Sequence, residues 1–458
     1  MAGAPRRWMS PVARPGRAGR GLLALTLGAV LMGGLTGCDT WFGAREDPPL
    51  PGERIAVLLN ARTLEPDPKL ADAEILLPPP AVNPDWPQPG GYANHAMHHL
   101  AVGETLSQAW SVDIGTGGDD EERLIAPPVV ADGRVYAMDA ESAVAAFDAA
   151  TGESLWHTDL TPDEEDDGHI SGGITFGDGR IYAATGFAEV VALDAATGQE
   201  LWRRQVEAPM RVAPTTRGGR VFVVTTDNRL IALNGRTGET LWTHAGEAEV
   251  AGLLGGGSPA VDNGVVVAPF STGELVALRV DTGRLLWSDT LLAVRRTDVV
   301  STLAAIRGRP VIDRGRVFAI SHGGLMVAID LRTGRRVWER EIAGYESPWV
   351  AGRYVFTLTS SAELVCLDRD TGRVYWVSTL PQYEDEENRE DPIVWAGPIL
   401  ASDRLIVSGS NGQAWAVSPY TGNPLGRIEM PDPVDVPPVI AGGTLYFLTD
   451  GADLVAYR

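Results

Sequence analysis

The sequence predicts an all-β fold, an eight-bladed β-propeller built from four-stranded antiparallel blades. Three observations support this prediction: a phrase repeated about every 45 residues, short apolar strands between Gly and Asp turns within each repeat, and a strand-like segment around Trp110 that completes the last repeat. Repeats of about 40 to 50 residues with several strands each are typical of propeller blades, which must stack on one another to bury both faces of each sheet.

The repeated phrase is an apolar strand, usually an Asp or Asn, two further residues, Thr-Gly, three residues and a Trp. Thr151 in the first copy and Thr421 in the seventh are 270 residues apart, so six intervals give a mean period of 45 residues. The seventh copy has Gly426 in place of the Trp. The copies occupy residues 147–156, 193–202, 233–242, 278–287, 329–338, 367–376 and 417–426.

Within one repeat, residues 127–157, four short segments rich in Val, Tyr and Ala are bounded by Gly and Asp, as expected of strands. Asp148 can accept hydrogen bonds from the backbone of its own turn, and Gly152 can adopt the positive φ that a tight hairpin needs. We interpret the Trp of each repeat as packing between blades. The change Trp242→Ala is therefore expected to cost about 3–5 kcal/mol of stability.

The final fragment, residues 437–458, supplies only three strands. The segment 105–115 carries Trp110 in the apolar setting of an outer strand but has no blade of its own. We expect it to pair with the C-terminal fragment as the fourth strand of the eighth blade. This pairing closes the ring and removes two exposed sheet edges.

Residues 1–37 are predicted to be a lipoprotein signal peptide. They contain five arginines and no acid, followed by an apolar run of about ten residues and Leu-Thr-Gly before Cys38. The run is shorter than the roughly 20 residues of a membrane span. The ending resembles a bacterial lipobox, which implies lipid attachment at Cys38. Asp39 follows, and since this residue favours inner-membrane retention in some sorting systems, the choice of membrane stays open.

Residues 38–104 are rich in proline and are interpreted as an extended tether, so that the propeller comprises residues 105–458. The tether contains a cluster of three histidines, His95, His98 and His99. A packed or solvated turn is the expectation for this cluster, because no Cys and no His-Glu-x-x-His pattern accompanies it as further metal ligands. The remaining cysteine, Cys366, lies in a strand pattern and is expected to be a small buried apolar residue.

The charge of the chain argues against binding to nucleic acid. The net charge is −22 at pH 7, and binding to nucleic acid requires a basic patch. The acids gather in the segments 117–123, 161–167 and 383–391, each of which precedes the first strand of a blade. These segments are expected to be solvated loops on one rim of the ring, since none has the residue order of a calcium-binding loop.

Two connections between blades are candidate binding loops. The segment 250–259 is rich in glycine, and the segment 288–310 places four arginines among apolar residues of an acidic protein. Loops on a rigid scaffold often carry binding residues, but inward packing of both segments is an equally open interpretation.

The repeated phrase, which covers about three quarters of the chain, resembles the repeat of the propellers related to pyrroloquinoline-quinone dehydrogenases. Within that superfamily the architecture is similar to the BamB family, lipoproteins of the outer-membrane β-barrel assembly machine. The resemblance implies a non-catalytic scaffold without cofactor or metal. It would be anchored at the periplasmic face of the outer membrane, would dock the periplasmic domains of the barrel-forming subunit, and could contact unfolded outer-membrane proteins.

The resemblance also implies a docking surface. In that family it includes Leu-Arg-Gly in the loop matching residues 253–255 and acidic residues in the loop matching 298–308. Leu253 and Gly255 match this pattern, while Leu254 stands at the Arg position and Arg307 near the acidic pair. The partner-binding residues expected on this basis and from the basic loop are Leu253, Leu254, Gly255, Arg295, Arg296, Asp298 and Arg307.

Two alternatives remain: a periplasmic ligand-binding propeller and a quinone-dependent dehydrogenase. Dehydrogenases of this superfamily carry an adjacent cysteine pair over the cofactor, and this sequence has no Cys-Cys. No phosphate-binding loop, nucleotide fingerprint or Ser-His-Asp order is recognisable outside the turn glycines. The prediction is therefore a scaffold that performs no chemistry.

Overall fold

The computed structural model describes residues 64–70, 73–119, 122–163, 169–247, 255–292 and 305–458. Residues Thr63–Arg458 form one compact unit. Apart from one 3-10 turn, η1 (Pro68–Leu70), the regular elements of the described residues are strands. No helix among them is long and apolar enough to cross a membrane.

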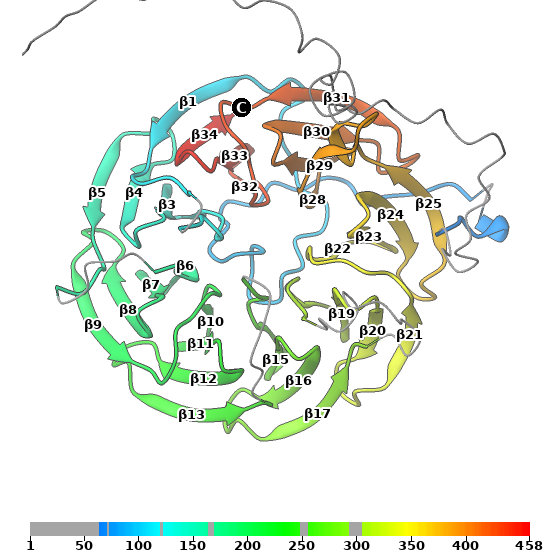
Figure 1. Cartoon of the computed structure of the whole chain (residues 1–458). Coiled ribbons are helices and arrows are strands. Elements are labelled where there is room, and N and C mark those ends of the chain that lie inside the picture. Colours follow the sequence, from blue (N-terminus) through cyan, green and yellow to red (C-terminus); the bar gives the residue numbers. More distant parts are fainter. Residues whose placement is uncertain (1–63, 71–72, 120–121, 164–168, 248–254, 293–304) are drawn as a thin grey trace, which may run out of the picture. The chain divides into compact units, whose positions relative to one another are not determined.

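Eight four-stranded antiparallel sheets form a ring (Figure 1), which confirms the predicted fold class. Blade 1 contains β2 (Val129–Ala131), β3 (Arg134–Met138), β4 (Val144–Asp148) and β5 (Ser154–Thr158). Blade 2 contains β6 (Gly173–Gly177), β7 (Arg180–Ala184), β8 (Glu189–Asp194) and β9 (Glu200–Gln205). Blade 3 contains β10 (Thr215–Arg217), β11 (Arg220–Val224), β12 (Arg229–Asn234) and β13 (Thr240–Ala245). Blade 4 contains β14 (Ala260–Asp262), β15 (Val265–Pro269), β16 (Glu274–Arg279) and β17 (Leu285–Thr290).

The second half of the ring repeats this pattern. Blade 5 contains β18 (Val311–Asp313), β19 (Arg316–Ile320), β20 (Met326–Asp330) and β21 (Arg336–Arg340). Blade 6 contains β22 (Trp349–Ala351), β23 (Tyr354–Leu358), β24 (Glu363–Asp368) and β25 (Val374–Thr379). Blade 7 contains β28 (Trp395–Ala401), β29 (Arg404–Gly409), β30 (Gln413–Val417) and β31 (Pro424–Glu429), and is preceded by a hairpin of β26 (Tyr383–Asp385) and β27 (Glu390–Pro392). Blade 8 contains β32 (Val439–Ala441), β33 (Thr444–Leu448), β34 (Asp453–Tyr457) and β1 (Gln108–Asp113).

The Thr-Gly turn forms because its side chains satisfy its own backbone. In blade 1, the carboxylate of Asp148 accepts hydrogen bonds from the Thr151 backbone N–H (2.9 Å) and hydroxyl (3.1 Å). These bonds lower the pKa of Asp148 below its usual value. Gly152 takes φ of 75°, a conformation that favours glycine. A β-bulge beside the turn shifts the register, so that Trp156 of the outer strand pairs with the small Ala146.

The tryptophans of the repeat join neighbouring blades, as the sequence suggested. Trp156 of blade 1 donates a hydrogen bond from Nε1 to the Ala195 carbonyl of blade 2 over 3.1 Å. A methyl group at Gly198, in the Thr-Gly turn of blade 2, would lie 2.6 Å from the Trp156 ring, so the turn glycine leaves room for the indole. The same donation occurs from Trp110, Trp202, Trp242, Trp287, Trp338 and Trp376.

Blade 8 explains why the seventh copy lacks its Trp. Its third and fourth strands are joined by hydrogen bonds between Ser107 and Arg458 instead of by a Thr-Gly turn. The outer strand of blade 7 therefore faces no turn glycine, and nothing lies within 4 Å of the position that a Cβ of Gly426 would take. The predicted closure is confirmed, since β1 pairs with β34 and Trp110 lies opposite Ala456.

The described part of the segment expected to be a tether is instead built into the ring. Figure 1 shows residues 73–104, the central segment, in blue across the middle of the propeller. It forms hydrogen bonds with the innermost strand, or the residue directly after it, in all eight blades. The partners in blades 1 to 8 are Val130, Phe176, Thr216, Val261, Ile312, Trp349, Leu400 and Gly442.

This correction to the expected tether over 38–104 has a physical cause. Innermost strands leave backbone N–H and C=O groups unpaired toward the ring axis, and buried groups of this kind need partners. Proline has a backbone carbonyl but no N–H, so a proline-rich chain cannot form a continuous β-ladder. It pairs through single bridges instead, such as that between Trp86 and Val130. The composition that indicated a solvated tether therefore also suits a filling for the centre of the ring.

Two histidines of the central segment, His95 and His98, lie against blade 5, and His99 lies against the central segment itself and Asp403 of blade 7. The Nδ1 atom of His95 lies 2.8 Å from the Pro310 carbonyl, and Nδ1 of His99 lies 2.6 Å from that of Pro78. The Nε2 atom of His98 lies 3.6 Å from Asp313. No group of three metal-ligating side chains is present among the described residues.

The central segment is expected to make the ring sensitive to acid through His95. Burial, together with the nearby Arg309 cation, lowers the pKa of His95 from 6.5 to about 3. Protons therefore bind the unfolded chain first as the pH falls below 6.5, and stability from this site falls with pH by about 2 kcal/mol at pH 5. The change His95→Asn keeps a donor and suits φ of 59°, so urea midpoints of this variant should change less between pH 7 and pH 5 than those of the parent protein. Equal pH dependence of the two proteins would contradict the assignment.

Candidate functional site

One axial face of the ring is hollowed at its centre. The loops that lead into the innermost strands meet there, because all innermost strands enter the ring from the same side. Three adjoining hollows share lining residues. They are an axial hollow of about 620 Å³, a narrow Arg309 hollow of about 50 Å³ beside it, and a hollow of about 120 Å³ between blades 3 and 4.

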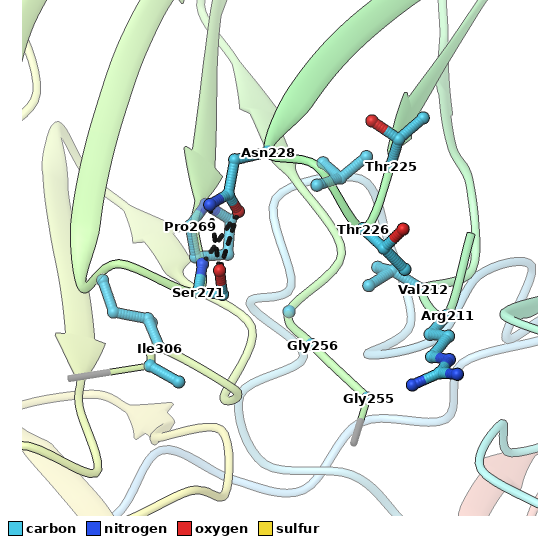
Figure 2. Close-up of a pocket in the computed structure, with 13 residues that line it drawn as sticks. Arg211, Val212, Thr225, Thr226, Asn228, Gly255, Gly256, Pro269, Ser271 and Ile306 are labelled. Atoms are coloured by element: carbon cyan, nitrogen blue, oxygen red, sulfur yellow. Dashed lines mark hydrogen bonds between the residues drawn. The ribbon is translucent and has the colours of Figure 1, made fainter. Parts of the chain in front are cut away.

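The hollow between blades 3 and 4 is shown in Figure 2. Its wall is fixed by Asn228, whose side chain donates to the Ser271 hydroxyl (2.9 Å) and accepts from the Ser271 backbone N–H (3.0 Å). Asn228 adopts φ of 60°, which Asn tolerates better than most residues. Arg211 lies toward the ring axis beside Gly255 and Gly256, and all three residues also line the Arg309 hollow.

The Arg309 hollow is closed at its base by the central segment. Pro89 lines it, and a Cβ at Gly90 would lie 3.1 Å from the Arg309 Nε atom. Glu346 lines both this hollow and the axial hollow. Burial lowers the pKa of the Arg309 guanidinium and raises that of the Glu346 carboxyl, although Arg307 and Arg309 oppose the second shift.

Arg307 and Tyr345 form the wall between these two charges. The guanidinium carbon of Arg307 lies 5.6 Å from the centre of the Tyr345 ring, in cation–π geometry. Burial, followed by the Glu346 charge, raises the pKa of Tyr345 to about 12. The phenol is therefore neutral at any physiological pH, and its ring serves to hold Arg307 in place.

Two carboxyl groups line the opposite wall of the axial hollow. Burial and the charge of Asp435 raise the pKa of Asp450 to about 7. Two carboxylates this close share a proton more readily than they both ionise, so the pair carries less than its full charge near neutral pH. We call Arg211, Arg307 and Arg309 the basic side of the hollows and Glu346, Asp435 and Asp450 their acidic side. Arg123 also lines the axial hollow, where its charge opposes the rise in the pKa of Asp450.

The structure brings together two of the residues expected to bind a partner. A Cβ at Gly255, in the connection between blades 3 and 4, would lie 3.5 Å from Nε of Arg307, in the connection between blades 4 and 5. Leu253, Leu254, Arg295, Arg296 and Asp298 lie outside the described residues, as does the lipid-attachment candidate Cys38.

Sequence reasoning missed most of the charged groups in the hollows. A signal was available, because the innermost strand of a blade often follows a proline, and the charged residue one to two positions before that proline faces the axis. Arg309 precedes Pro310, Glu346 precedes Pro348 and Asp435 precedes Pro437 in this way. This signal marks single positions before the innermost strands. It does not show that the three residues meet, because they come from different repeats.

The family model described as outer membrane protein assembly factor BamB matches residues 140–378, which is more than half of the chain. The model of the β-propeller domain of glucose, ethanol and alcohol dehydrogenases matches residues 101–177. BamB of Legionella pneumophila is 26% identical over 202 residues, covering 44% of this chain and 50% of that protein. BamB of Alkalilimnicola ehrlichii is 27% identical over 207 residues, covering 45% and 52%.

The curated relatives are matched over about half of their length. Among solved structures, BamB from Moraxella catarrhalis superposes with a TM-score of 0.65 at 19% identity, covering 77% of this chain and all of that one. A europium-containing methanol dehydrogenase gives the same TM-score at 13% identity, with 82% and 98% covered. These structural likenesses establish the fold that both groups share, and the family model that matches more than half of the chain is that of BamB. The chain belongs to the BamB family of propellers with pyrroloquinoline-quinone-like repeats.

Proposed function

We propose that the protein is a non-catalytic scaffold of outer-membrane β-barrel assembly. Membership of the BamB family carries this proposal, since the relatives are named as outer membrane protein assembly factors. In this role the ring docks the periplasmic domains of a barrel-forming subunit and supports folding and insertion of outer-membrane proteins. A rigid propeller suits docking, because its loops lose little conformational freedom on binding.

The docking surface that we propose is the rim between blades 4 and 5, called the blade 4–5 rim. It comprises Gly255 and Arg307 together with Leu253, Leu254, Arg295, Arg296 and Asp298, which lie outside the described residues. The approach of Arg307 to Gly255, where an added Cβ would lie 3.5 Å from the Arg307 Nε atom, supports a single surface from the loops that lead into blades 4 and 5. The partner surface would be apolar with acidic groups, since this rim offers leucines and arginines.

We further propose that a lipid on Cys38 holds the protein at the periplasmic face of the outer membrane, with retention at the inner membrane as the alternative because of Asp39. Unfolded outer-membrane proteins are proposed as additional partners. The outermost strands present unpaired edges around the ring, and the exposed strand β31 is one of them. Such edges can accept an added strand from an extended chain.

A ligand-binding propeller is the second candidate, favoured by the axial hollow of about 620 Å³ with its charged walls. A quinone-dependent dehydrogenase has less support. The two cysteines of the sequence, Cys38 and Cys366, are far apart, so the adjacent cysteine pair expected over a quinone cofactor cannot form within one chain.

The docking proposal is tested by affinity purification of the acylated protein from detergent-solubilised envelopes. The double variant Leu253→Arg with Arg307→Glu should recover at least roughly tenfold less barrel-forming subunit, because it replaces an apolar residue by a charge and reverses a charge in the two loops of the proposed rim. The control is Arg217→Glu, at the far end of β10 from the hollows. Equal recovery with the double variant and the control would refute this docking surface, and failure of the parent protein to recover any barrel protein would refute the scaffold.

A further inference from the structure

The basic side of the hollows carries three arginines without side-chain hydrogen bonds. In the part of the chain that the structure describes, Arg211, Arg307 and Arg309 each lack an acceptor for the guanidinium group, although each lines the Arg309 hollow. The Nε atom of Arg309 is fully enclosed and unpartnered. Arg211 is exposed and Arg307 is half-buried, so water can reach their donors, but an enclosed donor such as Nε of Arg309 normally pairs with a carboxylate or phosphate, because unmet buried donors are costly.

The acidic side contains a buried acceptor that lacks a hydrogen-bond donor. Oδ1 of Asp435 is buried without a hydrogen-bond partner, and Asp435 lines both the Arg309 hollow and the axial hollow. Glu346, which also lines both, accepts one backbone N–H from Gly397 over 3.3 Å. An unmatched donor, Nε of Arg309, and an unmatched acceptor, Oδ1 of Asp435, thus belong to residues that line the same hollow.

The protein does not pair these groups with each other. Arg309 and Glu346 affect one another electrostatically, yet no ion pair within 4 Å joins Arg309 to Glu346 or Asp435 among the described residues. Other arginines of this acidic chain do form such pairs, for example Arg336 with Asp289 at 2.7 Å. The separated charges leave a gap that an additional molecule of opposite polarity could bridge.

The shape of the space favours a small ligand. The central segment closes the base through Pro89 and Gly90, so the hollows do not form an open channel along the ring axis. The axial hollow of about 620 Å³ lies within the range of roughly 300–1,000 Å³ that is usual for small-molecule sites. Arg307, Glu346 and Asp435 line both the narrow and the wide part of the site, and the volume of the wide part leaves room for a side chain or a further residue.

We propose that this site binds a small zwitterion of the amino-acid or short-peptide class, with its carboxylate on Arg307 and Arg309 and its ammonium group between Glu346 and Asp435. A simple anion would leave the buried Oδ1 of Asp435 unmatched, and a simple cation would leave the enclosed Nε of Arg309 unmatched. The zwitterion satisfies both walls. This site is separate from the docking function proposed above, so either proposal can fail without the other.

The test is calorimetric titration of the purified full-length protein with L-alanyl-L-alanine, its N-acetyl derivative and its C-terminal amide. The parent dipeptide should bind, and each blocked form should bind at least about tenfold more weakly, since each loses charge-assisted hydrogen bonds. Equal affinity for the dipeptide and either blocked form, or no heat from any of the three, would overturn the proposal.

Two variants connect binding to the residues. Arg309→Met and Glu346→Gln should each weaken dipeptide binding at least about tenfold, while the surface control Arg217→Gln leaves it unchanged. The Tm of each variant, measured without ligand, shows whether the variant is folded, so that loss of binding can be distinguished from loss of structure. Arg309→Met is expected not to lower the Tm, because it removes an enclosed guanidinium whose Nε has no partner. Unchanged binding by a folded Arg309→Met variant would contradict the site.

The zwitterion could be a free peptide or the end of a partner chain. Adding saturating dipeptide during affinity purification separates the two sources. Reduced recovery of a partner would assign the site to a chain terminus, and unchanged recovery, with dipeptide binding intact, would assign it to a free ligand. The calorimetric result decides in both cases whether the site itself exists.

Discussion

Replacing Trp242 by alanine is expected to lower the free energy of unfolding by about 3 kcal/mol, at the lower end of the range for removal of a packed aromatic side chain. The indole packs 5.9 Å, centre to centre, from Phe222 of its own blade. It also donates to the Val280 carbonyl of the next blade over 3.0 Å and covers Gly283 of the Thr-Gly turn there. The change therefore opens a joint between blades 3 and 4 and leaves a carbonyl without its donor.

The matched control is the preceding residue, Leu241, which points away from the joint. Its side chain is 44% exposed, so Leu241→Ala is expected to change stability by less than about 1 kcal/mol. The measurement is the urea midpoint of each variant, compared at an unchanged dependence of the free energy of unfolding on urea concentration. Similar midpoints for the two variants would show that the Trp242 contact contributes little to cohesion of the ring.

The repeat made the fold predictable because each copy contains the residues that determine its own turn, strands and contact with the next blade. Asp148 and Gly152 specify a turn, alternating apolar residues specify the strands, and Trp156 specifies the contact with the next blade. Seven copies of one phrase leave little choice of architecture. The closure through Trp110 followed from the same reasoning, since the C-terminal fragment lacked a fourth strand and the strand around Trp110 had no blade of its own.

The candidate site could not be predicted in this way, because it is made of residues that differ between copies. Arg309, Glu346 and Asp435 come from three blades and meet only once the ring is closed. Their sequence surroundings resemble those of any loop before an innermost strand. The expectation of Gly255 came from family resemblance, and that of Arg307 also from the four arginines of the segment 288–310, which include Arg309.

The central segment was misread for a different physical reason. The proline-rich composition of residues 73–104 indicates that they do not form a regular strand or helix. It does not indicate whether the rest of the chain provides hydrogen-bonding groups against which they can pack. The innermost strands of eight blades offer such a surface, with unpaired backbone groups facing the axis. Proline content then lowers the entropy cost of fixing the segment there, which favours burial over a solvated tether.

Trp86→Ala is expected to cost about 3–5 kcal/mol, an effect that no solvated tether residue could produce. Trp86 is 2% exposed, its ring stacks on Trp349 of blade 6 at 6.2 Å, and its backbone exchanges two hydrogen bonds with Val130 of blade 1. Trp86 thus links the central segment to blade 6 through its side chain and to blade 1 through its backbone. The alanine variant keeps the backbone bonds and loses the buried area and the stacking on Trp349.

Trp86→Phe provides the matched control. It keeps an aromatic ring against Trp349 and removes the indole Nε1, which is buried without a hydrogen-bond partner. The phenylalanine variant should therefore retain most of the stability, with a loss of about 1–2 kcal/mol. Urea midpoints at pH 7 distinguish the cases. If the alanine variant unfolds at the same urea concentration as the parent protein, the central segment does not hold the blades together, and cohesion of the ring must come from the joints between blades alone.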